Sequence, residues 1–361
     1  MKPSFHALTV RAIERLTDDS VAITFDVPEE LSAAYRFLPG QHVAVRTPLA
    51  GDDVRRSYSI CSVDELRVAV KRLPGGAFSS MAIDRLRVGD EIDVMTPTGR
   101  FGVTVDPDRS RHIVCVAAGS GITPIRSIVE AVLRFEPRSR ATLLYGNRTT
   151  ASVMFGEELH DLKDRYPSRF QLVHVLSREL SEIELFAGRI DGAKLRWFLD
   201  TVLACAEVDE WYLCGPQPMV ADLRAVLLER GVPRAAVRTE LFHVGPLRST
   251  TEVSGIVERS AIADEAGVDS CEVTAVLDGR GSTFRLPREG VSVLEGVLGV
   301  RTDAPFACRG GVCGTCRARI IEGEVSMDQC YALEPEEVAA GYALTCQSHP
   351  TTDRIVVDYD T

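Results

Sequence analysis

The sequence has no long apolar run and no excess of positive charge. Its longest charge-free apolar stretch, residues 112–125, has about 14 residues and contains glycine and proline, whereas a membrane-spanning helix needs about 20 apolar residues. Residues 1–11 lack the apolar run of a signal peptide. The net charge of −11 opposes a general affinity for nucleic acid or anionic lipid, because both are polyanions. We therefore expect a cytoplasmic protein that binds neither a membrane nor nucleic acid.

Cysteine is plentiful, and its spacing is informative. A reducing cytoplasm disfavours disulfides, so clustered thiols there indicate metal binding or redox chemistry. The spacing Cys308-x4-Cys313-x2-Cys316, with Cys346 further along, is the plant-type [2Fe–2S] pattern. The glycines between these cysteines allow a tight loop whose N–H groups point at the sulfurs. A tetrahedral zinc site is the alternative, but zinc sites favour paired C-x2-C elements and here there is one. We expect Cys330 to be a free thiol.

The hydrophobic pattern changes twice along the chain. Residues 1–108 contain short alternating segments separated by turns, which predict an antiparallel β-barrel. Residues 109–243 contain apolar runs alternating with helical segments, which predict an α/β domain with a parallel sheet. Residues 244–270 have no steady period and are interpreted as a linker. Residues 271–361 form a small last region around the cysteine cluster.

A glycine turn in the second region is typical of dinucleotide binding. The first apolar run, its turn and the following helical segment contain Gly119-x-Gly121-x-x-Pro124. The proline departs from the G-x-G-x-x-G fingerprint, but at a first helical position it loses no needed N–H. Such a turn presents a helix N-terminus to a pyrophosphate. An ordinary tight turn between a strand and a helix is the alternative.

Several stretches resemble the ferredoxin–NADP reductase superfamily. They are RRSYSICS at 55–62, with FLPGQHV before it and GGAFSS after it, then AAGSGITPI at 117–125 and CGPQPM at 214–219. The stretch DAPFACRGGVCGTCRARIIEGEV, followed by LTCQSHP, is similar to a plant-type ferredoxin, which has a β-grasp α+β fold. The resemblance covers nearly the whole chain. It implies FAD, a nicotinamide dinucleotide and a [2Fe–2S] cluster as cofactors, with FMN as the alternative flavin.

The resemblance also implies roles for individual residues. Arg56 would pair with a flavin phosphate, Tyr58 would cover the isoalloxazine, and Ser59 would hydrogen-bond near flavin N5. Taken alone, R-x-Y-S is a weak signal and is more typical of a strand with alternating exposed polar residues. Further residues would hold phosphates at helix starts, namely Gly76, Ser79 and Ser80 for the flavin and Gly119, Gly121, Thr123 and Pro124 for the nicotinamide dinucleotide.

The same resemblance places a group of residues beside the two reacting rings. Cys214 and Gly215 would form the turn beside the nicotinamide, with Cys214 near the hydride path. Glu240 and Phe242 occupy the place where related reductases put a residue against the flavin ring, and Ser59 completes the catalytic group. A buried core cysteine is the alternative for Cys214.

The choice between NADH and NADPH depends on the ends of two predicted strands. An NAD site usually offers a carboxylate to the ribose 2′-OH, whereas arginine suits a 2′-phosphate. Here the strand ends read YGNR and LSRE, and they supply Arg148, Ser177 and Arg178. We therefore predict NADPH. The alternative is that both arginines are solvated surface residues.

The order of the three domains predicts electron transfer. A nicotinamide releases two electrons as hydride, a [2Fe–2S] cluster accepts one at a time, and a flavin can do both. Within the superfamily, YRFLPGQH, LLYGNRT, GRIDG and ALEPEEVAAGYALTCQ are most similar to the reductase subunits of phenylacetyl-CoA epoxidases, which supply a di-iron oxygenase. The alternatives are the reductase of another bacterial oxygenase, such as a steroid ring hydroxylase, and a stand-alone diaphorase.

The last region is strongly acidic. Residues 271–361 contain 14 acidic residues and eight arginines, a net charge of −6. We expect an acidic face around the cluster to dock the oxygenase. The alternative is that this charge serves only solubility.

Overall fold

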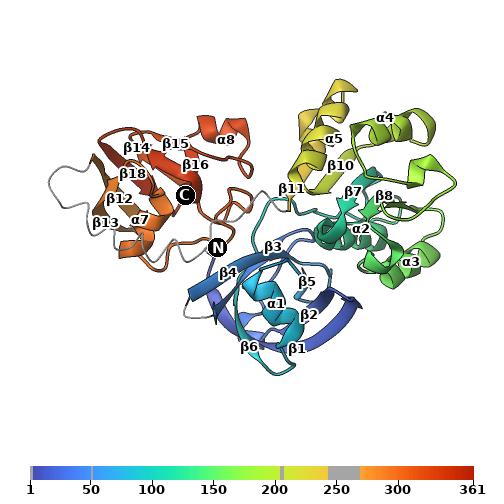
Figure 1. Ribbon diagram of the computed structural model, residues 1–361, viewed down its shortest axis with the longest axis horizontal. Helices are drawn as coiled ribbons and strands as arrows, with labels where there is room; N and C mark the ends of the chain where they lie inside the picture. Colours follow the sequence, from blue (N-terminus) through green and yellow to red (C-terminus); the bar gives the residue numbers. More distant parts are fainter. Residues whose placement is uncertain (1–2, 50–51, 204–206, 243–268) are drawn as a thin grey trace. The chain divides into compact units, whose positions relative to one another are not determined.

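The computed structural model describes residues 3–49, 52–203, 207–242 and 269–361 (Figure 1). The chain divides into two compact units, residues 4–243 and a C-terminal unit. Of the predicted linker 244–270, all but the last two residues lie outside the described part. Within the described ranges, no helix is both long enough and apolar enough to cross a membrane.

The first domain is a six-stranded antiparallel sheet in the order β4-β3-β6-β1-β2-β5. The ends of this order meet at a bridge between Ile60 and Val68, which closes the sheet and confirms the predicted barrel. Side chains of a strand alternate between its two faces, so Val43 and Val45 of β3 belong to the barrel core, whereas Ala44 between them is buried outside that core. The elements are β1 (Phe5–Thr17), β2 (Ser20–Asp26), η1 (Glu29–Leu31), β3 (His42–Leu49), β4 (Asp52–Ser59), β5 (Arg67–Lys71), α1 (Ala77–Asp84) and β6 (Glu91–Met95).

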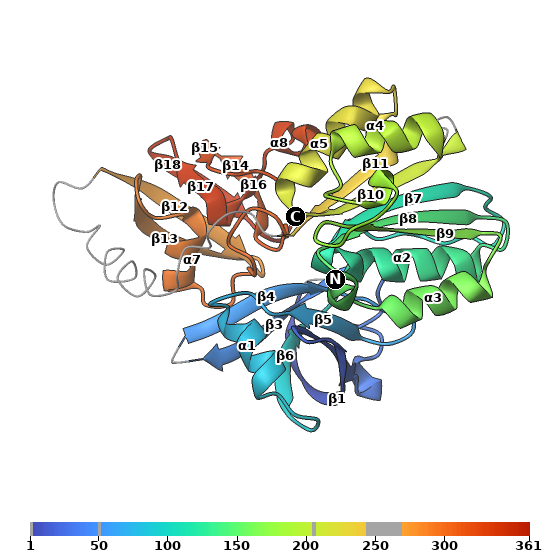
Figure 2. The same ribbon diagram turned by 45° about the vertical axis from the view of Figure 1, so that its right-hand side comes forward.

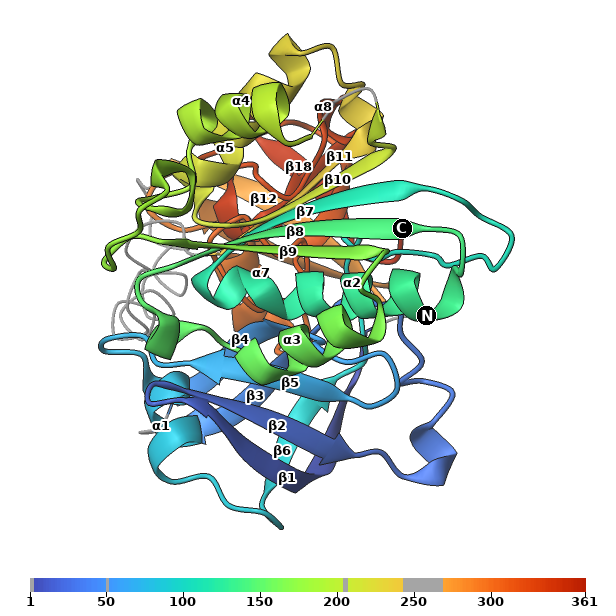
Figure 3. The ribbon, with the colours of Figure 1, turned by 90° about the vertical axis from the view of Figure 1, so that its right-hand side faces the viewer.

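The second domain is a parallel sheet in the order β11-β10-β7-β8-β9, as predicted. Figures 2 and 3 show α2 and α3 on one face of the sheet and α4 and α5 on the other. Both faces are therefore buried, which explains the continuous apolar runs of its strands. The elements are β7 (His112–Ala118), η2 (Gly119–Gly121), α2 (Ile122–Phe135), β8 (Arg140–Asn147), η3 (Thr150–Ser152), α3 (Gly156–Arg165), β9 (Phe170–Leu176), η4 (Glu184–Phe186), α4 (Gly192–Thr201), β10 (Glu210–Gly215), α5 (Gln217–Glu229), η6 (Arg234–Ala236) and β11 (Val237–Leu241).

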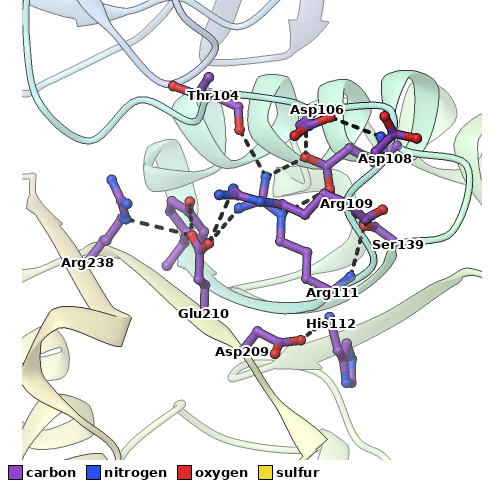
Figure 4. Close-up of polar contacts among 12 residues, drawn as sticks. Thr104, Asp106, Asp108, Arg109, Arg111, His112, Ser139, Asp209, Glu210 and Arg238 are labelled. Atoms are coloured by element: carbon purple, nitrogen blue, oxygen red, sulfur yellow. Dashed lines mark hydrogen bonds and ion pairs between the residues drawn. The ribbon is translucent and has the colours of Figure 1, made fainter.

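A buried ion network holds the segment that joins these two domains (Figure 4). The Arg111 side chain, 3% exposed, donates to both carboxylate oxygens of Glu136, with distances of 2.7 and 3.0 Å. It also contacts Glu210 at 2.5 Å and donates to the carbonyl of Thr104 at 3.2 Å. Because every partner is a charged or hydrogen-bonding group, the buried charge is compensated. The network therefore fixes the connecting segment against the amino ends of β7 and β10.

The C-terminal unit is a mixed sheet in the order β13-β12-β18-β14-β16, with a separate pair β15-β17. Strands β12 and β18 pair in parallel, while the other pairs are antiparallel. Buried residues of α7, among them Leu294 and Val297, share one core with the sheet, which confirms an α+β domain. The elements are β12 (Ser270–Leu277), β13 (Arg280–Pro287), α7 (Val293–Val300), β14 (Arg317–Glu322), β15 (Val325–Met327), α8 (Pro335–Ala339), β16 (Tyr342–Leu344), η8 (Thr345–Gln347), β17 (Ser348–Pro350) and β18 (Arg354–Asp358).

Candidate functional site

The parallel sheet offers a binding position at the carboxyl ends of β7 and β10. From β7 the sheet extends to β8 and β9 on one side and to β10 and β11 on the other. Ligands of open α/β sheets bind at such a switch point. Here the backbone approaches very closely, because a Cβ on Gly121 would lie 2.4 Å from the Cys214 carbonyl oxygen. The two predicted cofactor turns, at Gly119–Gly121 and at Cys214–Gly215, are therefore in contact.

The glycine turn differs from the prediction in one detail. Helix α2 begins at Ile122, so Pro124 is the third helical residue and not the first. The proline is still harmless, because the first four N–H groups of a helix have no partner within it. Gly119 has a φ of 53°, and its carbonyl accepts from the Tyr145 hydroxyl at 3.0 Å. Thr123 donates to the Ser120 carbonyl at 3.1 Å. The turn is thus held in place with a helix N-terminus directly after it.

The residues predicted to lie beside the reacting rings meet at one place. The Ser59 hydroxyl, at the end of β4, donates to Glu240 Oε2 at 3.1 Å across the two domains. Glu240 is paired with Cys214 in the β10–β11 register, and Phe242 donates its N–H to the Gly215 carbonyl at 2.9 Å. Burial and the nearby Glu240 raise the pKa of the Cys214 thiol well above its ordinary value. Cys214 is therefore a neutral thiol at physiological pH.

His42 is a member of this group that the sequence analysis did not identify. Its Nδ1 lies 3.9 Å from Glu240 Oε1, and its side chain is 5% exposed. It lies within the FLPGQHV stretch quoted for the flavin resemblance, which was the available signal. Ser59 and His42 thus approach Glu240 from two neighbouring barrel strands, β4 and β3.

The predicted flavin residues lie on β4 and at the start of α1. The rings of Tyr58 and Phe78 are 5.4 Å apart, and burial raises the Tyr58 pKa. The Arg56 guanidinium donates to the Arg55 carbonyl at 2.7 Å. The Ser79 hydroxyl holds its own turn, since it accepts from the Leu73 N–H at 3.1 Å and donates to the Gly76 carbonyl at 3.2 Å. This leaves backbone N–H groups of the first turn and the Ser80 hydroxyl as donors for an anion.

The predicted dinucleotide arginines lie together at the carboxyl ends of β8 and β9. The Arg178 N–H donates to the Arg148 carbonyl at 2.8 Å, and the Ser177 N–H donates to the Asn147 carbonyl at 2.9 Å. Both arginine residues are exposed, and neither has an ion-pair partner in the described part of the chain. The neighbouring carboxylate of Glu179 is occupied by Thr150, which donates from N at 2.6 Å and from Oγ1 at 2.8 Å.

The four predicted cluster ligands form two pairs. The thiols of Cys308 and Cys313 are hydrogen-bonded, as are those of Cys316 and Cys346. In the described ranges, no three or more His, Cys, Asp or Glu side chains are placed to hold one metal ion. A structural zinc ion needs four ligands around one point, whereas a [2Fe–2S] cluster divides four thiolates between two irons. The pairing therefore fits the binuclear cluster.

The pKa shifts of three of these thiols follow from burial and from their closeness to one another. The neighbouring thiol and burial raise the pKa of Cys308 and of Cys316 well above the ordinary value. The hydrogen bond with Cys316 lowers the pKa of Cys346. Four thiolates at this spacing would repel one another, so their joint deprotonation requires bound metal.

Backbone N–H groups of the cysteine loop point at the sulfurs. Gly310 N lies 3.4 Å from Cys308 Sγ, and Thr315 N lies 3.5 Å from Cys313 Sγ. Gly311 has a φ of 73°, and a Cβ there would lie 3.0 Å from the Gln329 carbonyl. Cys330 forms no disulfide, and burial raises its pKa. The loop therefore supplies donors of the kind that stabilise negative sulfur.

Three domain families match the chain in succession. They are the Oxidoreductase FAD-binding domain at residues 7–102, the Oxidoreductase NAD-binding domain at residues 115–225 and the 2Fe-2S iron-sulfur cluster binding domain at residues 275–351. These are the three domains described above.

Two relatives match over nearly their whole length. The chain is 41% identical over 360 residues to one of the subunits of the 1,2-phenylacetyl-CoA epoxidase of Escherichia coli (strain K12), covering 99% of this chain and 98% of that protein. It is 32% identical over 361 residues to the ferredoxin reductase component of 3-ketosteroid-9-alpha-monooxygenase of Rhodococcus rhodochrous, covering 98% and 96%. The solved structure of phthalate dioxygenase reductase shares the fold, with a TM-score of 0.58, 22% identity and 98% coverage of both chains.

Proposed function

This chain belongs to the family of three-domain oxygenase reductases, and we propose that it carries electrons from NADPH to the oxygenase component of a phenylacetyl-CoA epoxidase. The observation that carries the proposal is the 41% identity to an epoxidase protein across all three domains. The steroid monooxygenase reductase, at 32%, supports the second candidate. We assign residues 1–108 to FAD, 109–243 to the dinucleotide and 271–361 to the cluster, and we place the protein in the cytoplasm.

The carboxyl ends of the parallel strands form what we call the carboxyl edge of the sheet. Residues of this edge and of the barrel would bind different parts of the two cofactors. Bound FAD would supply the conversion of a two-electron hydride into single electrons for the cluster. The N-termini of α1 and α2 would bind the flavin and dinucleotide phosphates, and Arg56 would add a charge. Arg148, Ser177 and Arg178 would hold the 2′-phosphate of NADPH. Ser59, Cys214, Glu240 and Phe242 would line the contact between the two rings.

The neutral Cys214 thiol and the Ser59–Glu240 hydrogen bond suit this role. Hydride transfer requires that donor and acceptor rings be held in van der Waals contact, with water excluded. The Cys214 side chain carries no charge and is fully buried in the hydrophobic core, as its alternative reading as a core cysteine expects, so it would exclude water from behind the site and would not offer an exposed surface to a ring. The hydrogen bond from Ser59 to Glu240 fixes a hydroxyl at the edge where β4 meets β11.

The cluster ligands are tested by metal analysis. We propose Cys308, Cys313, Cys316 and Cys346 as ligands, so the purified protein should contain about two irons and two sulfides per chain. Cys346→Ser should abolish the cluster spectrum. Cys330→Ser, the matched control, should leave it intact. One zinc and no sulfide would exclude this assignment.

The physiological acceptor is tested by reconstitution. The reductase should support NADPH-dependent product formation by a phenylacetyl-CoA epoxidase oxygenase, and less by a 3-ketosteroid monooxygenase oxygenase. The reverse order would favour the steroid pathway. If neither oxygenase turns over while artificial acceptors are reduced, the protein is a stand-alone diaphorase.

Docking through the acidic ferredoxin domain is tested with salt. Glu334 precedes α8, and Glu336 in α8 is exposed with no ion-pair partner in the described part of the chain. Charge steering acts mainly on association rate and is screened over about 8 Å at physiological salt. Coupled turnover should therefore slow as salt rises. At low salt, the variant with lysine at Glu334, Glu336 and Glu337 should turn over more slowly than wild type. Turnover that ignores both changes would show that docking is not electrostatic.

A further inference from the structure

Helix α2 connects the two proposed cofactor sites. Its N-terminus is the turn proposed for the dinucleotide pyrophosphate, and its next turn contacts the barrel. Figure 3 shows α2 and α3 on the barrel side of the parallel sheet. The Gly40 N–H donates to Ser127 Oγ at 3.0 Å, and a Cβ on Gly40 would lie 2.9 Å from Ile128 Cδ1. Arg126, the preceding residue, donates through Nη1 to the carbonyl of Cys61.

Cys61 is fixed from both sides and lies two residues after Ser59. Its N–H donates to the Arg67 carbonyl at 2.9 Å, and its thiol donates to the same carbonyl at 3.3 Å. Its own carbonyl accepts from Arg126. The path from the glycine turn through Arg126 to Ser59 is therefore short and consists of bonded contacts.

The Arg126 guanidinium is held in one orientation. Its side chain is 10% exposed, and it contacts Glu158 at 2.5 Å and Glu130 at 3.1 Å. Glu158 also receives two hydrogen bonds from Arg67, at 3.0 and 3.1 Å. The ring of Phe155 lies 5.4 Å from each arginine, a distance typical of cation–π contact. Moving a buried charge away from these partners would cost free energy, because the charge would be left uncompensated.

We propose that Arg126 is a positioning residue for hydride transfer: its bond to the Cys61 carbonyl sets the dinucleotide-binding helix at a fixed distance from the flavin strand. The proposal rests on the proposed function. A misplacement of about 1 Å can cost about 100-fold in rate even when binding is intact. Arg126 therefore affects the reduction rate and leaves nucleotide affinity nearly unchanged.

The test compares Arg126→Met with Arg134→Met in the holoprotein. Arg134 lies on the same helix and also reaches the barrel, at 2.5 Å from Asp64, but the two side chains are 42% and 57% exposed. Arg126→Met should slow flavin reduction by NADPH about 10- to 100-fold in stopped flow. The Kd for NADP⁺ by calorimetry should change less than about threefold. Arg134→Met should match wild type, and Arg126→Lys should recover part of the rate.

Hydrogen exchange gives a readout that does not depend on activity. In Arg126→Met the amides of Gly40 and Cys61 should exchange faster, while those of β8 stay unchanged. Should Arg126→Met fail to fold, Ser127→Ala removes the neighbouring link to Gly40 and should slow reduction less but in the same way. Unchanged reduction in a folded variant, or equal loss in Arg134→Met, would overturn the proposal. Wild-type protein that lacks flavin or ignores both nucleotides would contradict the proposed function instead.

Discussion

Arginines at the two ends of the parallel strands differ in whether they are paired with carboxylates. At the amino edge, formed by the amino ends of the strands, Arg111 is buried and paired with Glu136. It is also paired with Glu210, and both Arg111 and Glu210 are labelled in Figure 4. At the carboxyl edge, Arg148 and Arg178 are exposed, and neither pairs with a carboxylate in the described part of the chain. A compensated charge stabilises a fold but is unavailable to a ligand, whereas an uncompensated one attracts an anion. Pairing with carboxylates therefore separates Arg111, which is structural, from Arg148 and Arg178, the two arginines that we propose bind the dinucleotide.

The largest expected effect is at the amino edge. Glu136→Gln should lower the free energy of unfolding of the dinucleotide domain by about 3 kcal/mol, because Arg111 keeps its charge while losing a buried carboxylate. Urea unfolding followed by tryptophan fluorescence measures this, since both tryptophans, Trp197 and Trp211, lie in this domain. The KM for NADPH should stay within about twofold of wild type. A stability loss below about 1 kcal/mol would mean that the network contributes little.

The next largest effect is expected at the carboxyl edge, where the KM for NADPH should change and the stability should not. Arg178→Ala should raise the KM for NADPH about 10- to 100-fold, or about 1.4–2.8 kcal/mol, because a charged hydrogen bond to the 2′-phosphate is lost. The KM for NADH and the urea midpoint should not change. Parallel rises for both nucleotides would show that Arg178 does not contact the 2′-phosphate.

A smaller effect depends on pH. Burial alone would raise the pKa of the Glu210 carboxyl. The hydrogen bond from Tyr212 and the charge of Arg111 outweigh burial and hold this pKa below its ordinary value. A depressed carboxyl pKa contributes stability that is present above the unfolded pKa, about 4.3, and is lost as pH falls through the folded value. Wild type should therefore lose stability more steeply than Glu210→Gln below about pH 4. Identical slopes in urea titrations would contradict this.

The smallest effect is expected at an exposed ion pair at the amino edge. Arg140 and Glu207 are 3.1 Å apart, with side chains 51% and 64% exposed. Glu207→Gln should change the free energy of unfolding by less than about 1 kcal/mol, since exposed ion pairs are screened by water. It is the matched control for Glu136→Gln. Equal losses in the two variants would mean that burial does not explain the amino edge.

The sequence predicted the domains better than the contacts between them. Alternating and continuous apolar runs identified the barrel and the parallel sheet. Local cysteine spacing singled out four thiols, and their role as cluster ligands stays a prediction. Arg111 and Arg126 gave no such signal, because their partners are distant in sequence: Glu210 is 99 residues from Arg111, and Cys61 is 65 from Arg126. Pro124 and Ser79 show a second limit. Their motifs were recognised, but the exact helix start and the bonds of one hydroxyl depend on the folded turn.

The parallel pairing of β12 with β18 has a consequence for how the ferredoxin domain is made. β18 is the central strand of its sheet, yet it follows every other strand of that domain in the chain. Glu272 pairs with Arg354, 82 positions later (354 minus 272). Contacts of such long range slow folding, because a large loop must close before they form. During synthesis the flavin and dinucleotide domains can fold first, and the sheet beneath the cysteine loop is completed only after nearly all of its own domain has been translated.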